Sequence, residues 1–218
     1  MKEELSTTIK RIAILLAGLV IAHLGVTLFL LADLGADPFN VLVQGLCRTA
    51  GGAAGMSFLT HGMTHIAVSL LIIIVLLFVD RSYIKIGTII CMICGGPIID
   101  LFTRLLSPLL QEPAMAVKLM VNCLGCVILA FGMTIVIKSD AGTGPNDLVA
   151  LVISDKSGKK FGLVRAAVDL SFVLAGYLLG GSVGIGTIIC AFLVGPVAGF
   201  FMPISQRITE RIVRPGKG

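Results

Sequence analysis

The amino-acid sequence predicts an all-α membrane protein with six transmembrane helices, two short half-helices and an inverted-topology internal repeat (three crossings per unit). Three observations support this fold class: the chain is strongly apolar, its apolar runs have the length of a bilayer crossing, and its two halves share motifs. Of the 218 residues, 56% are hydrophobic and 13% are charged. A soluble domain carries about 25% charged residues, so lipid is the simpler solvent for this chain.

Six apolar runs approach the ~20 residues that a helix needs to cross a bilayer. The first follows a basic N-terminal segment and is too long for a cleaved signal peptide, so we expect it to be retained. The predicted spans are residues 12–32, 58–79, 84–105, 116–137, 163–179 and 185–204. Two shorter apolar stretches, residues 38–46 and 145–153, each follow a Gly-Pro turn. They are expected to be half-helices or re-entrant segments, which need protein or a water-filled cavity around their broken backbone.

The basic residues support this topology. They sit at the ends of apolar runs and not on a stripe with interleaved aromatics, so the net charge of +5 does not indicate nucleic-acid binding. With six crossings and a cytoplasmic N-terminus, only Arg48, Arg104 and Lys118 of the 17 basic residues fall outside. This bias follows the positive-inside rule and places both termini in the cytoplasm. The predicted organisation is a cytoplasmic segment (1–11), a first membrane repeat (12–106), an extracytoplasmic connector (107–115), a second membrane repeat (116–204) and a basic cytoplasmic tail (205–218).

The internal repeat is visible at two sequence offsets. At an offset of 99, the six residues 86–91 recur unchanged as 185–190, and the Gly-Pro pair at 96–97 recurs at 195–196. Because each unit contains three crossings, the second unit must begin on the opposite face of the membrane. Secondary transporters often use such inverted repeats, with interrupted segments at matching positions around the substrate site. At an offset of 107, the matched pairs are Gly18/Gly125, Gly25/Gly132, Thr27/Thr134, Asp33/Asp140, Gly35/Gly142 and Pro38/Pro145.

The two Gly-Pro turns are the candidate substrate-binding site. Proline suits the first turn of a helix because its missing N–H would be unpaired there, and the helix N-terminus offers N–H donors and a positive dipole end to a ligand. The acidic residues of the turns could instead be ordinary helix caps and interfacial charges. The candidate binding residues are Gly35, Asp37, Pro38 and Asn40 in the first turn, and Gly142, Gly144, Pro145, Asn146 and Asp147 in the second.

These motifs give the chain a family resemblance. The segments 34–40 (LGADPFN) and 141–147 (AGTGPND), with the duplicated IGT and the later GP, resemble the YczE/YyaS/YitT group of bacterial membrane proteins, closest to its YczE branch. The resemblance covers about residues 12–201 and implies a multi-pass protein of the bacterial inner membrane. It brings no substrate and no catalytic residue with it. The two halves differ from each other at Asp37, where the second half has Gly144.

Ionisable residues inside the predicted spans are further candidates, because buried charge in a membrane is expensive and commonly functional. We expect His23, His65 and Asp169 to form coupling or pairing groups, with histidine able to carry a proton near neutral pH. His61, Arg165 and Asp100 are expected to be interfacial helix-end residues. An offset of 104 aligns His61 with Arg165 and His65 with Asp169.

Other motifs favour packing over chemistry. The pairs Cys91/Cys94 and Cys123/Cys126 could hold zinc in principle, but they lie in apolar helices without basic neighbours, so we expect neither a metal site nor a cofactor. Two G-x-x-x-G spacings, at 176–180 and 195–199, are expected to be close helix contacts. Neither a nucleotide-binding motif nor a nucleophile constellation appears.

The sequence therefore predicts a non-enzymatic secondary transporter or exporter of a small polar or anionic solute. It would work by alternating access between the two repeats, with a proton as the candidate coupling ion. The alternative is a non-transporting membrane subunit that binds and supports a partner enzyme or transporter. A transporter requires a polar cavity between the repeats, whereas a supporting subunit could be dry inside and present an apolar groove. The expected partners are the lipid bilayer and the solute, and a second copy of the chain in a homo-oligomer is a further candidate partner.

Overall fold

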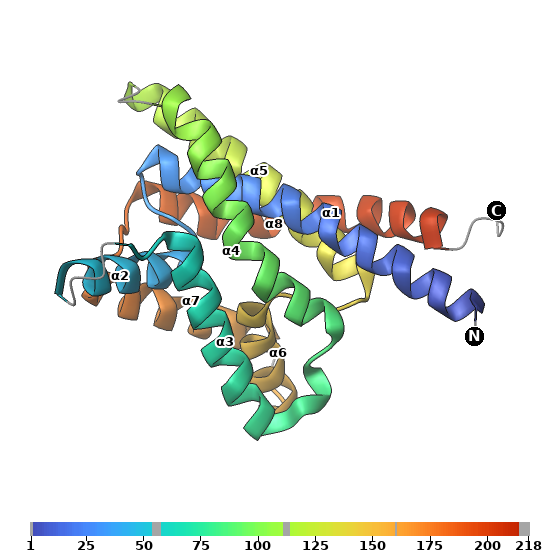
Figure 1. Ribbon diagram of the computed structural model, residues 1–218. Helices are drawn as coiled ribbons and strands as arrows, with labels where there is room; N and C mark the ends of the chain where they lie inside the picture. The colour runs from blue at the N-terminus through green and yellow to red at the C-terminus, as the bar shows by residue number, and fades with distance from the viewer. Residues whose placement is uncertain (1, 54–57, 111–113, 160, 214–218) are drawn as a thin grey trace.

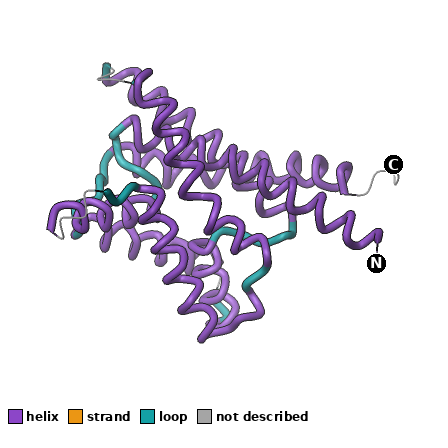
Figure 2. The backbone as a smooth tube through the Cα atoms, viewed as in Figure 1, coloured by secondary structure: helices purple, strands orange, loops and turns teal. Residues whose placement is uncertain are grey.

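The computed structural model describes residues 2–53, 58–110, 114–159 and 161–213, which form helices joined by turns and loops and contain no strand. Figure 2 draws each of these segments as helix or loop, and Figure 1 gives the order of the helices along the chain. Short 3-10 turns follow α3 and α4. The α-helices are α1 (Lys2–Ala32), α2 (Pro38–Ala53), α3 (His61–Asp80), α4 (Ile86–Leu106), α5 (Met115–Ser139), α6 (Pro145–Ser157), α7 (Phe161–Leu178) and α8 (Ile185–Val213).

Five of the six predicted spans correspond to described helices that are long and apolar enough to cross a membrane, namely α1, α3, α4, α5 and α8. The sixth corresponds to α7, which has 18 residues and carries Arg165 and Asp169. This helix is not among the five candidate spans of the described chain. The all-helical, membrane-type architecture is thus confirmed, whereas a crossing by α7 stays a prediction.

The two helices that follow the Gly-Pro turns are longer than predicted. α2 has 16 residues and α6 has 13, and each begins at its proline. α2 packs against α7 of the second unit, and α6 packs against α3 of the first. We count α1 to α4 as the first unit and α5 to α8 as the second, so each short helix is covered by the third helix of the opposite unit. Figure 1 shows α2 and α6 beside α7 and α3.

The core of the molecule is the crossing of α1 and α5. Gly18 lies against Gly132, and Gly25 lies against Gly125, so the two helices run antiparallel. A side chain at Gly132 would meet the backbone of Ala22, which explains why the closest approach is built on glycine. Because the contacting glycines are repeat equivalents with their roles exchanged, the contact is self-complementary in the manner of a two-fold axis.

The turns between the long and the short helices also match. Asp33 and Asp140 both adopt left-handed backbone conformations, with φ of 50° and 56°. Two residues later, Gly35 and Gly142 have φ of 107° and 147°, values that favour glycine because it has no Cβ. A Cβ at Gly35 would also clash with Thr187.

Each turn is held by the fourth helix of the opposite unit. The Gly87 N–H donates a hydrogen bond to the Ala141 carbonyl oxygen at 3.0 Å. At the equivalent place, the Gly186 N–H donates to the Leu34 carbonyl oxygen at 2.6 Å. These two bonds give the duplicated IGT motif its role, since its glycine lets the start of the helix approach the turn backbone.

The last helix continues beyond its predicted end. α8 runs to Val213, so most of the predicted tail (205–218) is helical where it is described. Ser205 is fully buried and shares a 2.7 Å hydrogen bond with Thr134 of α5. Apolar length alone therefore underestimated this helix, because its polar residues are covered by α5.

The two G-x-x-x-G spacings have different outcomes. Gly176 packs against the backbone of Val41, so a close helix contact is confirmed there. Gly180, Gly195 and Gly199 have no neighbouring atoms within 4 Å of where a Cβ would lie. The prediction of a close contact within the chain is wrong for the 195–199 spacing, where the glycines face open space.

Candidate functional site

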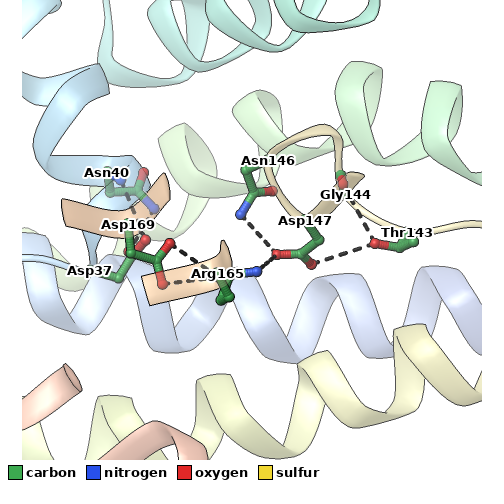
Figure 3. Close-up of polar contacts among 8 residues, drawn as sticks. All are labelled: Asp37, Asn40, Thr143, Gly144, Asn146, Asp147, Arg165 and Asp169. Atoms are coloured by element: carbon green, nitrogen blue, oxygen red, sulfur yellow. Dashed lines mark hydrogen bonds and ion pairs between the residues drawn. The ribbon is translucent and has the colours of Figure 1, made fainter. Parts of the chain in front are cut away.

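A polar network lies between the short helices and the third helices of the two units, with Arg165 of α7 at its centre. The Arg165 Nη1 donates to Asp147 Oδ1 of α6 at 2.5 Å, and its Nε donates to Asp169 Oδ2 at 2.9 Å. Figure 3 shows Arg165 between these two carboxylates. All three side chains are 21–29% exposed. A single guanidinium therefore pairs with two carboxylates in a largely solvent-excluded environment.

The first unit contributes an equivalent arrangement without an ion pair. Asp37 accepts a 2.7 Å hydrogen bond from the side-chain amide of Asn40 and a 3.3 Å bond from its backbone N–H. The side-chain amide oxygen of Asn40, Oδ1, lies 2.8 Å from Nε2 of His61. Since a carbonyl oxygen only accepts, Nε2 of His61 carries the proton in this contact.

The two arrangements occupy matching positions of the repeat. Asn40 is equivalent to Asp147, and His61 is equivalent to Arg165 at the offset of 104. In each half, the first turn of the third helix bonds to the first turn of the short helix. Among the described residues no hydrogen bond or ion pair joins the two arrangements, but Asp37 lies within electrostatic range of both Asp169 and Arg165. We call these six residues (Asp37, Asn40, His61, Asp147, Arg165 and Asp169) the polar network.

Asp147 is further supported by its own turn. Asn146 donates to Asp147 Oδ1 at 3.1 Å, and the Thr143 hydroxyl lies 3.5 Å from Oδ2 (Figure 3). The Gly144 carbonyl oxygen accepts the N–H of Asp147 at 3.1 Å and so caps α6. The Asp147 carboxylate therefore has a fixed position at the start of its helix.

The predicted binding residues divide into two roles. The side chains of Asp37, Asn40, Asn146 and Asp147 make the polar contacts just described, and Asp169 joins them through Arg165. The remaining residues shape the backbone: prolines begin the short helices, Gly35 and Gly142 turn the chain with positive φ, and Gly144 is the N-cap of α6. These residues are Gly35, Pro38, Gly142, Gly144 and Pro145.

His23 and His65 form a pair that is separate from the polar network. Their rings meet edge to face with centroids 5.6 Å apart, and His65 meets Phe39 in the same way at 5.2 Å. His23 Nδ1 lies 2.8 Å from the Leu19 carbonyl oxygen. His65 is 7% exposed, and its Nδ1 has no hydrogen-bond partner within the described part of the chain. The two histidines lie together, whereas Asp169 lies with Arg165, and neither histidine bonds directly to the network; a coupling role for His23, His65 and Asp169 stays a prediction.

Sequence reasoning undervalued three residues that it assigned to helix ends. His61 and Arg165 are the residues that connect the network, and the 104-residue offset was the signal that pointed to them. Asp100 of α4 accepts bonds from the Thr60 hydroxyl at 2.6 Å and the Gly62 N–H at 3.0 Å. It therefore caps the start of α3 from a neighbouring helix, which no local motif reveals.

A cavity of about 410 Å³ opens beside the network, between α1, α2, α4 and the start of α3. We call it the arginine vestibule after Arg48 and Arg104, which line it together with His61 and Asp100. Leu30 and Leu31 form an apolar part of its wall. His61 belongs both to this wall and to the network, so its ring connects the vestibule, through Asn40, to the half-buried Asp37.

Fold and site together define a multi-helix membrane protein with a polar network inside an apolar bundle. Residues 9–203 match the "Family of unknown function (DUF6198)", and the chain belongs to this family. The "Uncharacterized membrane protein YczE" of Bacillus subtilis is 30% identical over 214 residues, which cover 98% of this chain and 94% of that protein. The resemblance to the YczE group is confirmed.

Two further relatives are also similar to this chain over most of their length. An "Uncharacterized protein" of Haemophilus influenzae is 30% identical over 203 residues, covering 91% of this chain and 86% of its own length. The "Uncharacterized protein YyaS" of Bacillus subtilis is 28% identical over 191 residues, covering 87% and 91%. No solved structure matches the chain.

Proposed function

We propose that this protein is a secondary transporter or exporter of a small polar or anionic solute, working by alternating access between two inverted repeats. One observation carries the proposal: polar residues of both halves come within electrostatic range of each other at Asp37, and His61 connects the first-half group to an open vestibule. Transporters of this kind bind their solute at the interface of the repeats, beside interrupted helices. Opening and closing of that interface would expose the network to each side in turn.

The proposed topology has six crossings, with α7 as the sixth and both termini on the cytoplasmic face of the bacterial inner membrane. A helix of 18 residues is about 27 Å long, close to the ~30 Å hydrocarbon thickness. The antiparallel glycine contact of α1 and α5 and the matched turns support inverted units. α1 begins and α8 ends at the same end of the molecule, as an even number of crossings requires (Figure 1).

A proton is the coupling ion that we propose. Arg165 pairs with Asp147 and Asp169, and Asp37 lies within electrostatic range of the same guanidinium. Since uncompensated charge is costly at membrane depth, a proton on Asp37 or Asp169 would offset the excess negative charge while no solute is bound. The His23/His65 pair is the second candidate for carrying a proton.

The competing proposal, a supporting subunit without transport, requires an apolar docking groove and a dry interior. The charged wall of the vestibule and the electrostatic proximity of Asp37 to Arg165 and Asp169 favour transport. We further propose that the chain has no enzymatic activity and binds its solute without a cofactor.

The test begins by comparing metabolites of deletion and overexpression strains, which identifies candidate solutes. Purified protein in proteoliposomes is then given each solute under an imposed pH gradient, and solute uptake is measured together with internal pH. We expect uptake that depends on the gradient and falls at least about tenfold, the equivalent of one charge-assisted hydrogen bond, in Asp147→Asn and Asp169→Asn. Asp155→Asn, on the exposed end of α6, is the matched control and should transport normally. Normal flux in both network variants contradicts the proposal.

A further inference from the structure

The arginine vestibule has a charge pattern of its own. Arg48 and Arg104 have no carboxylate partner among the described residues. Asp100, the one carboxylate among the described residues of the wall, already accepts bonds from the Thr60 hydroxyl and from the Gly62 N–H at the start of α3. An acidic group at a helix N-terminus is stabilised by the helix dipole, so Asp100 is satisfied without the arginines. The cavity therefore has surplus positive charge.

Arg48 is also positioned for a ligand. Its Nη1 donates to the Gly180 carbonyl oxygen at 2.8 Å and to the Ser182 hydroxyl at 2.9 Å, which anchors the side chain to the loop after α7. A guanidinium has five N–H donors, and these two bonds use those on Nη1. The remaining edge, Nε and Nη2, has the fork geometry that binds a carboxylate or another oxyanion with two hydrogen bonds.

The rest of the wall limits the kind of anion. Arg104 is exposed and makes no hydrogen bond or ion pair within the described chain, so it is available as a second cation. Leu30 and Leu31 give the cavity an apolar side. A volume of about 410 Å³ is at the small end of the range for ligand sites.

We propose that the arginine vestibule binds a small organic acid, with its oxyanion group at Arg48 and Arg104 and a short apolar body against Leu30 and Leu31. This inference builds on the proposed function, in which the vestibule is the entrance to the polar network. It names the substrate class: a carboxylate, or a similar oxyanion, with a short apolar portion. His61, which faces both spaces, would be the first network residue that the acid meets.

Binding can be measured without any transport. Purified protein in neutral detergent is unfolded by heat with a thiol-reactive dye that reports exposure of its cysteines, in the presence of butyrate as the probe. Ligand binding raises the unfolding midpoint. We expect butyrate to raise it, whereas butyramide and sodium chloride at equal concentration do not. The affinity for butyrate should fall about tenfold, one charge-assisted hydrogen bond, in Arg48→Gln and in Arg104→Gln.

The matched control is Arg81→Gln, an exposed arginine after the opposite end of α3 without an ion pair in the described chain. It should bind butyrate like the wild type. Equal shifts with butyramide, or an Arg104→Gln variant that binds normally, overturn the proposal. A response to inorganic phosphate alone, or to phosphatidylglycerol alone, also overturns it, because the site would then serve a free phosphate or a lipid headgroup.

A second measurement applies even where an arginine variant fails to fold. Cys47 lines the vestibule and is half-buried, so a variant that keeps only this cysteine can be labelled with small charged methanethiosulfonates. Relative to a free thiol, the anionic reagent should react faster than the cationic one, and butyrate should slow both. Faster labelling by the cationic reagent contradicts a cation-lined site.

The two proposals fail in different ways. Butyrate binding through Arg104 without flux of any solute would contradict the proposed transport function and support the organic-acid site. Flux that depends on Asp147 and Asp169, together with no butyrate binding, would leave the transport function intact and sink the organic-acid site.

Discussion

Arg165 is the residue on which the charge balance of the network depends. Removing it leaves Asp147 and Asp169 facing each other without a cation. Loss of one partner from a buried ion pair costs about 3–5 kcal/mol, and side chains that are 21–29% exposed place the expected loss near the lower figure. We predict that Arg165→Gln strongly lowers the thermal midpoint of the purified protein.

A second substitution separates charge from packing in this prediction. Adding Asp169→Asn to Arg165→Gln removes one of the unpaired carboxylates, so the double variant should recover part of the lost stability. Thermal unfolding of the wild type, both single variants and the double variant measures the coupling. If the two losses simply add, the carboxylates do not depend on Arg165 for their charge balance.

Asp140 gives a prediction that depends on pH. The hydrogen bond from Lys85, followed by burial in the opposite direction and by Arg11, gives its carboxyl group a pKa below the usual value of 3.8. A lowered folded-state pKa adds stability above the unfolded pKa, and this stability is lost as pH falls through the folded value. Asp140→Asn should thus lower the thermal midpoint at neutral pH, slightly because the side chain is 60% exposed. The difference from the wild type should begin to shrink as the pH falls below the model-peptide value and should disappear once the pH is below the lowered folded-state pKa; a difference that does not shrink with falling pH excludes this origin.

At the residue scale, the sequence identified the turns but not the centre of the network. Asp37, Asn40 and Asp147 follow from glycine, proline and the repeat, all of which are local patterns. Arg165 and His61 were assigned to helix ends because a hydropathy run alone does not say which neighbour covers a charged side chain. The partner helix decides this, since α6 brings Asp147 to Arg165 and α2 brings Asn40 to His61.

At the scale of single elements, the α1/α5 crossing tests the role of the duplicated glycines. A methyl group on Gly132 would meet the Ala22 backbone, whereas one on Gly199 meets no atom within 4 Å. We predict that Gly132→Ala is destabilising, by about 1–3 kcal/mol as for an overpacked core. Gly199→Ala should be neutral or stabilising by up to ~1 kcal/mol, because alanine is the better helix former. Thermal unfolding in detergent compares the two, and equal behaviour would show that the close approach is not needed.

Helix lengths show where prediction from sequence ends. The start and end of α5 lie within two residues of the expected 116–137, since both are set by the apolar run. α8 exceeds its apolar run by nine residues because Ser205 and Thr209 are buried. α2 and α6 extend past their apolar stretches for a similar reason, because α2 packs against α7 and α6 packs against α3. Polar helix ends are thus fixed by tertiary cover, which hydropathy does not record.

At the scale of the whole molecule, the two halves share a backbone plan but differ in charge. The second half holds its short helix with an ion pair between Arg165 and Asp147, and the first uses a neutral bond between His61 and Asn40. The neutral bond is the weaker of the two, and it lies on the side of the vestibule. Under the proposed alternating access, one interface opens before the other, and this difference leads us to expect that the vestibule side opens first.

Orientation in the membrane decides whether the two units are inverted. With six crossings, Lys85 before α4 and Lys159 after α6 lie on the cytoplasmic face, and Arg104 near the end of α4 lies on the opposite face. Single cysteines placed at these three positions in a cysteine-free variant can be labelled on intact cells with a membrane-impermeant maleimide. We expect position 104 to react in intact cells and positions 85 and 159 to react only after permeabilisation. Because α4, α5 and α6 lie between positions 85 and 159, labelling of these positions from opposite faces would mean an odd number of crossings between them. It would contradict α6 as a half-helix, and with it the three-crossing units whose symmetry brings both Gly-Pro turns to one site.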